Sequence, residues 1–250
     1  MIKGQGELRR AYQDDRVARE YVDQRFTSPL GAMLHARQTR VLRALIGAQG
    51  IGRVAEIAPG PARLTVDVAR LLKTVTLIDA SAQMLGEARS RLAARHLADR
   101  VRLVQADAFH LPLAGEARFE LVYSFRLIRH FQRDDRLRLY EQIRSILGPR
   151  GWLVFDAVNE AVSAPLRARA GPGEYAHFDD LLRPDMLAEE LREAGFELVS
   201  LTGVQRRYPA LLKCQTILAP RSALLARAAM EIIDRSGGEP LEWVVVCRRR

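Results

Sequence analysis

Residues Val54 to Thr65 read VAEIAPGPARLT and predict a strand, a tight turn and the start of a helix. The strand is the apolar run 54–57, and the turn contains Pro59, Gly60 and Pro61. Leucine and valine at helical spacing follow, so we expect a helix over residues 61–72. A glycine turn of this kind lets a ligand approach the backbone closely, and the first helical turn presents free N–H groups to it.

Short β-branched runs alternate with amphipathic segments after this unit. The predicted strands are residues 75–78, 101–105, 121–123, 152–157, 196–201 and 241–247, and the predicted helices are 82–94, 134–147, 184–194 and 221–235. Such alternation is typical of βαβ units on a parallel sheet. We therefore expect an α/β, Rossmann-like doubly wound fold with a seven-stranded, mostly parallel sheet whose last strand is antiparallel.

The chain divides into a predicted helical cap and one larger domain. Residues 7–47 have apolar side chains at helical spacing, interrupted at Ser28-Pro29, so residues 1–47 are expected to form an N-terminal helical cap. Residues 48–250 would form the domain, with a lid or loop at 159–183 and a helical insertion at 205–239. In that insertion one helical face carries Leu224, Leu225, Ala228, Ile232 and Ile233.

Composition narrows the class of protein. The chain has 250 residues, 48% of them hydrophobic, and no apolar run long enough to span a bilayer. The N-terminus lacks the apolar core of a secretory signal, and Cys214 and Cys247 cannot form a disulfide framework, which favours a cytoplasmic location. No Cys/His cluster has metal-ligand spacing, so no metal site is expected.

Basic residues outnumber acidic ones, 39 to 30, giving a formal net charge of +9. This excess of positive charge could bind nucleic acid, anionic lipid headgroups or an acidic small substrate. Most of it is arginine interleaved with acids along predicted helices, which favours an ordinary solvated surface. A nucleic-acid partner is therefore not expected, and the oligomeric state stays open.

Acidic residues close three predicted strands, namely Glu56, Asp79 and Asp107. Because the carboxyl ends of parallel strands meet at one edge of a sheet, these side chains should face the crevice where open α/β sheets bind ligands. A carboxylate at the position of Asp79 suits a ribose, whereas Glu56 would repel a pyrophosphate. A cationic nucleoside without phosphate, such as S-adenosylmethionine, fits this pattern better than a dinucleotide.

The ordered motifs VAEIAPGPARLT, VTLIDASAQMLGEAR, VRLVQADAFHLPL, FELVYSF and IRSILGPRGWLVFDAVN resemble those of class I S-adenosylmethionine-dependent methyltransferases. Within that class the chain is similar to the small-molecule branch that includes ubiquinone/menaquinone C-methyltransferases. The resemblance implies S-adenosylmethionine as cofactor and methyl transfer to a small-molecule acceptor. Three groups of arginines after the fourth strand, in the lid and after the sixth strand would suit an anionic acceptor.

The resemblance also implies roles for individual residues. The cofactor would contact Tyr21, Arg25, Glu56, Ala58, Gly60, Asp79, Ala80, Met84, Asp107, Ala108, Phe109 and Ser124. Arg126 would face the transferable methyl, and His130 is the candidate general base, with a purely structural histidine as the alternative. Arg129, Tyr175 and His177 would contact the acceptor.

Two departures from the motif keep other functions open. Ala58 and Ala62 stand where the resemblance implies glycines, and alanine at φ > 0 costs on the order of 1 kcal/mol. A non-catalytic binding or regulatory module is therefore one alternative. An RNA methyltransferase is a weaker one, because Ser124-Phe125-Arg126 replaces the Asn/Asp-Pro-Pro-aromatic turn that grips a flipped base.

Overall fold

The computed structural model describes residues 26–112, 119–171, 175 and 178–250. Its strands are β1 (Arg53–Ile57), β2 (Thr74–Asp79), β3 (Val101–Gln105), β4 (Phe119–Ser124), β5 (Leu147–Asn159), β6 (Leu181–Leu182), β7 (Phe196–Arg206) and β8 (Pro240–Arg249). The strands form one sheet in the order β3-β2-β1-β4-β5-β8-β7, and the short β6 pairs with β5. β8 runs antiparallel to both of its neighbours, whereas the pairs from β3 to β5 are parallel. The predicted doubly wound sheet with an antiparallel last strand is confirmed.

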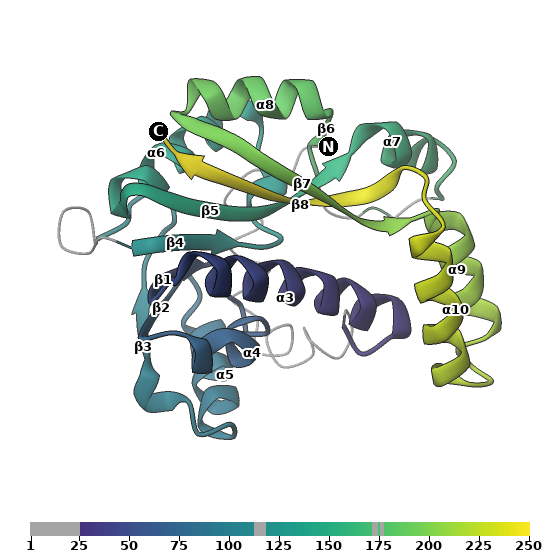
Figure 1. Cartoon of the computed structure of the whole chain (residues 1–250), viewed down its shortest axis with the longest axis horizontal. Coiled ribbons are helices and arrows are strands. Elements are labelled where there is room, and N and C mark those ends of the chain that lie inside the picture. The colour runs from purple at the N-terminus through teal and green to yellow at the C-terminus, as the bar shows by residue number, and fades with distance from the viewer. Residues whose placement is uncertain (1–25, 113–118, 172–174, 176–177) are drawn as a thin grey trace.

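Helices cover both faces of this sheet (Figure 1). They are α3 (Pro29–Gln49), α4 (Thr65–Val68), α5 (Ala82–Ala93), α6 (Arg133–Ile146), α7 (Glu160–Ala168), α8 (Pro184–Glu193), α9 (Tyr208–Ile217) and α10 (Ala223–Arg235), with single 3-10 turns at Ala69–Leu71, Ala98–Arg100 and Ile128–His130. α3, α4 and α5 lie on one face, and α6 and α8 on the other.

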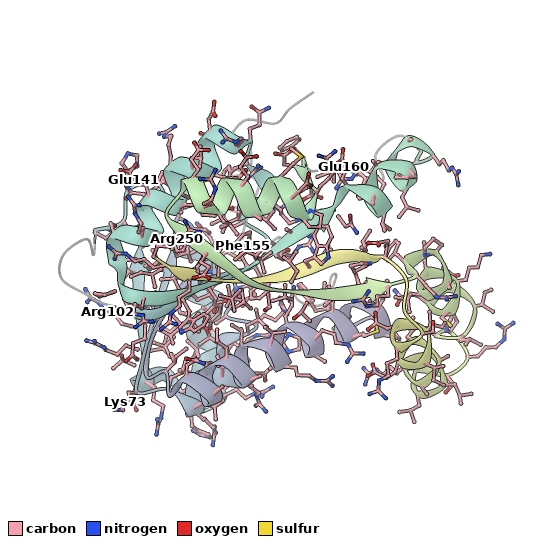
Figure 2. All side chains as sticks on the ribbon, turned by 45° about the horizontal axis from the view of Figure 1, so that its top comes forward. Lys73, Arg102, Glu141, Phe155, Glu160 and Arg250 are labelled. Carbon is pink, nitrogen blue, oxygen red and sulfur yellow. The ribbon has the colours of Figure 1, made fainter. Side chains whose placement is uncertain are left out.

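Alternate residues of each central strand point into two separate cores. Val54 and Tyr123 pack in the core beneath α3 and α5, whereas Ala55 and Val122 pack in the core beneath α6 and α8. Phe155 of β5 belongs to the second core, and Figure 2 shows it inside the molecule near α8. Both faces of the sheet are therefore buried, which explains why its strands read as nearly continuous apolar runs.

The predicted break at Ser28-Pro29 is the start of α3. Ser28 caps this helix by accepting a hydrogen bond from the Gly31 N–H, and Gly50 ends it in the left-handed conformation. Leu42 and Ile46 of α3 share the first core with the sheet. Residues 1–25 lie outside the described residues, and the division into a cap and a domain at residue 48 stays a prediction.

One sequence-based expectation about local structure was wrong, and two others were incomplete. The helix expected over residues 61–72 is only α4 and one 3-10 turn, because Ala62 adopts φ 56° and so cannot be helical. The segment 159–183, expected to be a lid or loop, begins with the helix α7, whose N-cap Asn159 accepts from the Ala161 N–H at 3.0 Å. The insertion 205–239 contains a second helix, α9, which the sequence analysis missed.

Candidate active site

The turn after β1 is built from left-handed residues. Ala58, Gly60 and Ala62 have φ of 52°, 54° and 56°. For a residue with a Cβ, this left-handed conformation costs roughly 1 kcal/mol or more of free energy. Ala58 and Ala62 therefore occupy positions where glycine would be unstrained. The backbone conformation that the glycine-rich motif needs is therefore kept without two of its glycines.

The two alanine methyl groups lie in different surroundings. Ala62 is fully buried and belongs to the core beneath α3, so its methyl points away from any ligand at the turn. Ala58 is half-buried, and its N–H donates to the Ile78 carbonyl at 2.8 Å. Of these two methyl groups, only that of Ala58 lies outside the core.

Glu56 lies underneath this turn and is almost fully buried. Its carboxylate accepts a hydrogen bond from the Thr65 hydroxyl, which lies 2.8 Å from the Tyr123 hydroxyl. Burial raises the pKa of Glu56 to about 7, against the lowering effect of these hydroxyls and of Arg63. Glu56 thus connects β1 to α4 and β4, and supports the turn from below.

Asp79, at the end of β2, is joined directly to the turn. Its carboxylate accepts hydrogen bonds from the Gly60 N–H at 3.2 Å and from the Ser81 N–H at 2.9 Å. Burial raises the pKa of Asp79 to about 6, although these backbone donors act in the opposite direction. The first two strand ends therefore meet at one point, as the sequence predicted.

The remaining predicted cofactor residues lie on neighbouring strand ends and on α5. Asp107, Ala108 and Phe109 follow β3 and are half-buried, and the Asp107 carboxylate accepts from the Phe109 N–H at 3.0 Å. Met84 in the first turn of α5 is buried, and Ala80 is half-buried. Ser124 is fully buried and donates its hydroxyl to the Ile57 carbonyl at 2.8 Å, so its side chain holds β4 to β1.

A cavity of about 340 Å³ lies beyond the end of β4, and none of the described residues predicted to contact the cofactor lines it. It lies between the start of α3, the segment after β4, α7, and the facing ends of β7 and β8. Its polar side chains within the described residues are Ser28, Arg126, Arg129, His130, Ser163, Arg167, Tyr175, Asp179, Gln205, Tyr208 and Glu242. The cavity brings together four of the predicted catalytic and acceptor residues, namely Arg126, Arg129, His130 and Tyr175.

Arg129 is buried among three carboxylates. It bonds to both oxygens of Asp179 at 2.7 and 3.1 Å, to Asp156 at 3.1 Å and to Glu242 at 2.6 Å. Burial alone would lower the pKa of Arg129, but these carboxylates hold it well above its ordinary value. Because four of its five N–H groups are engaged inside the protein, the guanidinium organises the cavity floor and has little left to offer an acceptor.

His130 is almost fully buried beside this network. Its Nδ1 lies 2.7 Å from the Phe178 carbonyl oxygen and 3.0 Å from an Asp179 oxygen. Both neighbours are acceptors, so Nδ1 carries the hydrogen, and the basic lone pair of the neutral ring is on Nε2. Burial would raise the pKa of Asp179, but His130 and Arg129 outweigh it and hold that pKa well below its usual range.

Two arginines complete the charged lining. Arg167 of α7 bonds to Asp179 at 2.5 Å and lies over the Tyr175 ring, 4.6 Å from its centroid. The Arg126 backbone N–H donates to Asp156 at 2.6 Å, and the residue adopts φ 62°. Within the described part of the chain, the Nε of Arg126 and the Oε2 of Glu242 are buried without a hydrogen-bond partner. Tyr21, Arg25 and His177 lie outside the described residues.

The strand-end residues fit S-adenosylmethionine. Asp79 is a half-buried carboxylate with lone pairs beyond its two backbone bonds, as a ribose diol requires. Asp79 and Asp107 supply negative charge for a cationic ligand, whereas Glu56 is buried beneath the turn, and Ala108 and Phe109 offer apolar surface at the same edge. Among the described residues no group of three or more His, Cys, Asp or Glu side chains could hold a metal ion.

Sequence reasoning missed the acidic partners Asp156, Asp179 and Glu242. Two of them carried a signal, because Asp156 interrupts the apolar run WLVFDAVN and Glu242 interrupts PLEWVVVC. A charged residue within a strand that is buried on both faces is rarely tolerated without a partner. Asp179 lacked such a signal, since its place beside His130 depends on how the segment before β6 folds back.

Part of the chain is similar to known methyltransferases. Residues 54–151 match the family model described as a methyltransferase domain. A ubiquinone/menaquinone biosynthesis C-methyltransferase of Azotobacter vinelandii is 34% identical over 128 residues, which are 50% of this chain and 49% of that protein. A ubiquinone biosynthesis O-methyltransferase of Xanthomonas axonopodis pv. citri is 26% identical over 160 residues, 61% of this chain and 65% of that protein. The chain thus spans half to just under two thirds of the length of these relatives.

A solved structure agrees over the whole chain. The magnesium protoporphyrin IX methyltransferase of Synechocystis PCC 6803, crystallised with S-adenosylhomocysteine, superposes with a TM-score of 0.70 at 12% identity, covering 99% of this chain and 100% of that one. At this identity the likeness concerns the fold alone. The Rossmann-like methyltransferase fold and the resemblance to small-molecule methyltransferases are therefore confirmed. Within the described residues, no helix is long and apolar enough to cross a membrane.

Proposed function

We propose that the chain is an S-adenosylmethionine-dependent methyltransferase acting on a small-molecule acceptor. The observation that carries this proposal is the hydrogen bond from the Gly60 N–H to Asp79, which joins the turn after β1 to the end of β2. These strand ends would bind the nucleoside, and the separate cavity that contains His130 would bind the acceptor, because a two-substrate transfer needs both sites. The methyltransferase domain match and the two curated relatives support the same activity.

In this proposal the protein contributes mainly binding and alignment. Asp79 would hold the ribose, Ala108 and Phe109 would pack against the adenine, and the turn at Ala58 to Gly60 would receive the methionine portion. S-adenosylmethionine, when bound, supplies a methyl group already activated by its sulfonium. The chain then has to orient the acceptor in line with that methyl and exclude water, and it needs no covalent catalyst.

His130 would accept the acceptor's proton through Nε2. Asp179 and the Phe178 carbonyl fix Nδ1 as the protonated nitrogen, which is the arrangement that a neutral imidazole base needs. Asp179 is then a positioning residue, and Arg129 keeps it ionised. This role applies to an acceptor that must lose a proton, such as a hydroxyl or an acidic carbon. The two relatives are named as C- and O-methyltransferases, so either atom is compatible with them.

An anionic acceptor remains part of the proposal, in a narrower form. The cavity arginines are paired with acids, since Arg126 lies 3.9 Å from Glu242, Arg129 bonds to Asp156, Asp179 and Glu242, and Arg167 bonds to Asp179. Arg126 alone, among the described arginines of the cavity, has a buried N–H without a partner. We therefore propose that Arg126 binds one carboxylate, or a similar anionic group, of the methyl acceptor. The arginines of this cavity are paired with acids, so they would not form a cationic surface for a nucleic-acid backbone.

The proposal is tested by incubating the full chain with isotopically labelled S-adenosylmethionine and a panel of small hydroxylated aromatic acids and their esters. Label should pass to at least one acid, more slowly to its ester, and the Arg126→Gln variant should lose this difference. Equal rates on acid and ester would remove the anionic acceptor. Cofactor binding without transfer to any acceptor would favour the alternative, a non-catalytic module, which the left-handed Ala58 motivates.

A further inference from the structure

The helices α9 and α10 form a hairpin whose outer apolar face is exposed. Nine large apolar side chains are exposed among the described residues, and five of them lie on this hairpin: Leu212, Ile217, Leu224, Leu225 and Ile232. The most exposed are Leu224, Ile232 and Leu225 of α10, at 79%, 71% and 67%. Figure 1 shows the hairpin standing beyond the end of α3, at the margin of the molecule. Such clustering of exposed aliphatic residues marks an interaction surface.

This face is not the one that attaches the hairpin to the protein. α10 buries Ala226 and Met230, and Met230 packs with Leu30, Met33 and Leu211. Arg37 of α3 holds the inner side through Asp234 and Glu231, at 3.0 and 2.9 Å. Leu224 and Ile232 are eight residues apart on the opposite side of the same helix. The sequence pattern predicted one apolar face, and the structure turns most of that face outward.

Basic residues flank the exposed leucines. Lys213, Arg221 and Arg227 are all exposed, and no aspartate or glutamate occurs between Tyr208 and Met230. The acids further along α10 are engaged, since Glu231 and Asp234 bond to Arg37. An apolar helical face bordered by uncompensated cations is the pattern of a helix that lies on an anionic membrane surface. A second copy of the chain would oppose the same cations across a twofold axis, which disfavours that occupant.

We infer that the α9–α10 hairpin docks the protein on a lipid bilayer that carries anionic headgroups. Leucine and isoleucine side chains would enter the interface, and the arginines and lysine would contact the headgroups. Tyr208, at the start of α9, lines the cavity, and Leu30 touches both the cavity and the hairpin core. Docking therefore brings the cavity close to the membrane surface. If the proposed function also holds, the cavity would take up a lipophilic methyl acceptor from the bilayer.

The experiment is co-sedimentation of the full chain with vesicles of phosphatidylcholine alone or mixed with phosphatidylglycerol. We expect binding to the anionic vesicles only, weakened by added salt. The variant Leu224→Ser/Leu225→Ser/Ile232→Ser should bind at least about tenfold more weakly. The matched control Met186→Ser/Val199→Ser changes exposed apolar residues of α8 and β7 and should bind as the wild type does. Because all five side chains are exposed, thermal melting should confirm that both variants remain folded.

Two results would overturn the inference. One is wild-type protein that stays in solution with anionic vesicles at low salt, and the other is a triple variant that still sediments with them. A stable dimer in solution that the triple variant dissociates would identify a second copy as the occupant instead. Titration with S-adenosylhomocysteine in the absence of vesicles reports on the proposed function separately.

Discussion

The Asp179 carboxylate lies 3.0 Å from the Nδ1 atom of His130 and is bonded through both oxygens to Arg129. One buried acid thus orients the candidate base and neutralises the cation beneath it. Removing one partner of a buried ion pair leaves an uncompensated charge, which costs more than the pair itself is worth. The stability of the cavity floor and the tautomer of His130 therefore depend on the same carboxylate.

Asp179→Asn should destabilise the protein by about 3 kcal/mol at neutral pH, measured by urea unfolding. The pKa of Asp179 is depressed, so its contribution is present above the pKa of the unfolded chain and is lost as the pH falls below about 4. Asp185→Asn is the control, because Asp185 pairs with Arg183 on the surface. It should leave the unfolding midpoint unchanged, and an equal loss in both variants would refute the claim for Asp179.

His130→Gln should lower kcat on hydroxyl acceptors by about 10² to 10⁴-fold, because a positioned general base contributes this much. Affinity for S-adenosylhomocysteine should not change, since His130 is assigned to the acceptor side. His110→Gln, at an exposed histidine after β3, is the control and should behave as the wild type does. Unchanged turnover in the folded His130 variant would make this histidine purely structural.

Ala58→Gly should bind S-adenosylhomocysteine about three- to tenfold more tightly, because it removes a partly exposed methyl group from the turn that would receive the ligand. Ala62→Gly also relieves φ of 56°, but it deletes a buried methyl from the core. It should leave affinity unchanged and lower the melting temperature. Affinity that rises equally in both variants would show that strain, and not the Ala58 methyl, limits binding.

Periodic patterns predicted the sheet and its helices well, because each strand end and each cap leaves a local signal. Ser28-Pro29, the apolar run of β1 and the acids Glu56 and Asp79 at strand ends are of this kind. The helix over residues 61–72 failed because the pattern of leucines cannot report a left-handed Ala62. The sequence could not show that the apolar face of α10 points outward, because amphipathicity shows which residues share a face and not what covers it.

The sequence could not predict the charged cavity floor, for a different reason. Arg129 looked like an acceptor ligand because arginines after the fourth strand of such a fold face the second substrate. Its three partners come from β5, β8 and the segment before β6, which are distant in sequence. Only tertiary structure reveals that the guanidinium is already neutralised. His130 lies where a base is needed, but its assignment to proton transfer stays a prediction.

Glu56→Gln should have a pH-dependent effect on stability. Burial raises the pKa of Glu56 to about 7, so its favourable protonated state is kept at acidic pH and lost as the pH rises through that value. At pH 8 the variant should be more stable by on the order of 2 kcal/mol, and at pH 4 the two proteins should be alike. Urea unfolding at both pH values measures this.

The Glu120→Gln variant should change stability with pH in the opposite direction to Glu56→Gln. The Arg53 and Gly52 N–H groups lower the pKa of Glu120, so its carboxylate stabilises the protein above its unfolded pKa. This variant should be less stable than the wild type at neutral pH and should match it at low pH. A destabilising Glu56→Gln at pH 8 would contradict the buried, protonated state assigned to Glu56.

Ligand affinity should follow the ionisation of Asp79. Both ribose hydroxyls need an ionised carboxylate to accept their hydrogen bonds, and the pKa of Asp79 is about 6. Affinity for S-adenosylhomocysteine should therefore fall below about pH 6, by up to tenfold per pH unit. Asp79→Asn should bind weakly at every pH, without this slope. A wild-type affinity that does not vary between pH 5 and 8 would exclude Asp79 as the ribose ligand.

Calorimetric titration of S-adenosylhomocysteine into the wild type and into Asp79→Ala at neutral pH tests the central claim most directly. We predict saturable binding of one ligand per chain by the wild type and a loss of at least about 2 kcal/mol of binding free energy in the variant, since hydrogen bonds to a charged group are removed. No binding at millimolar ligand, or equal affinity in the two proteins, would contradict the assignment of these strand ends as a cofactor site.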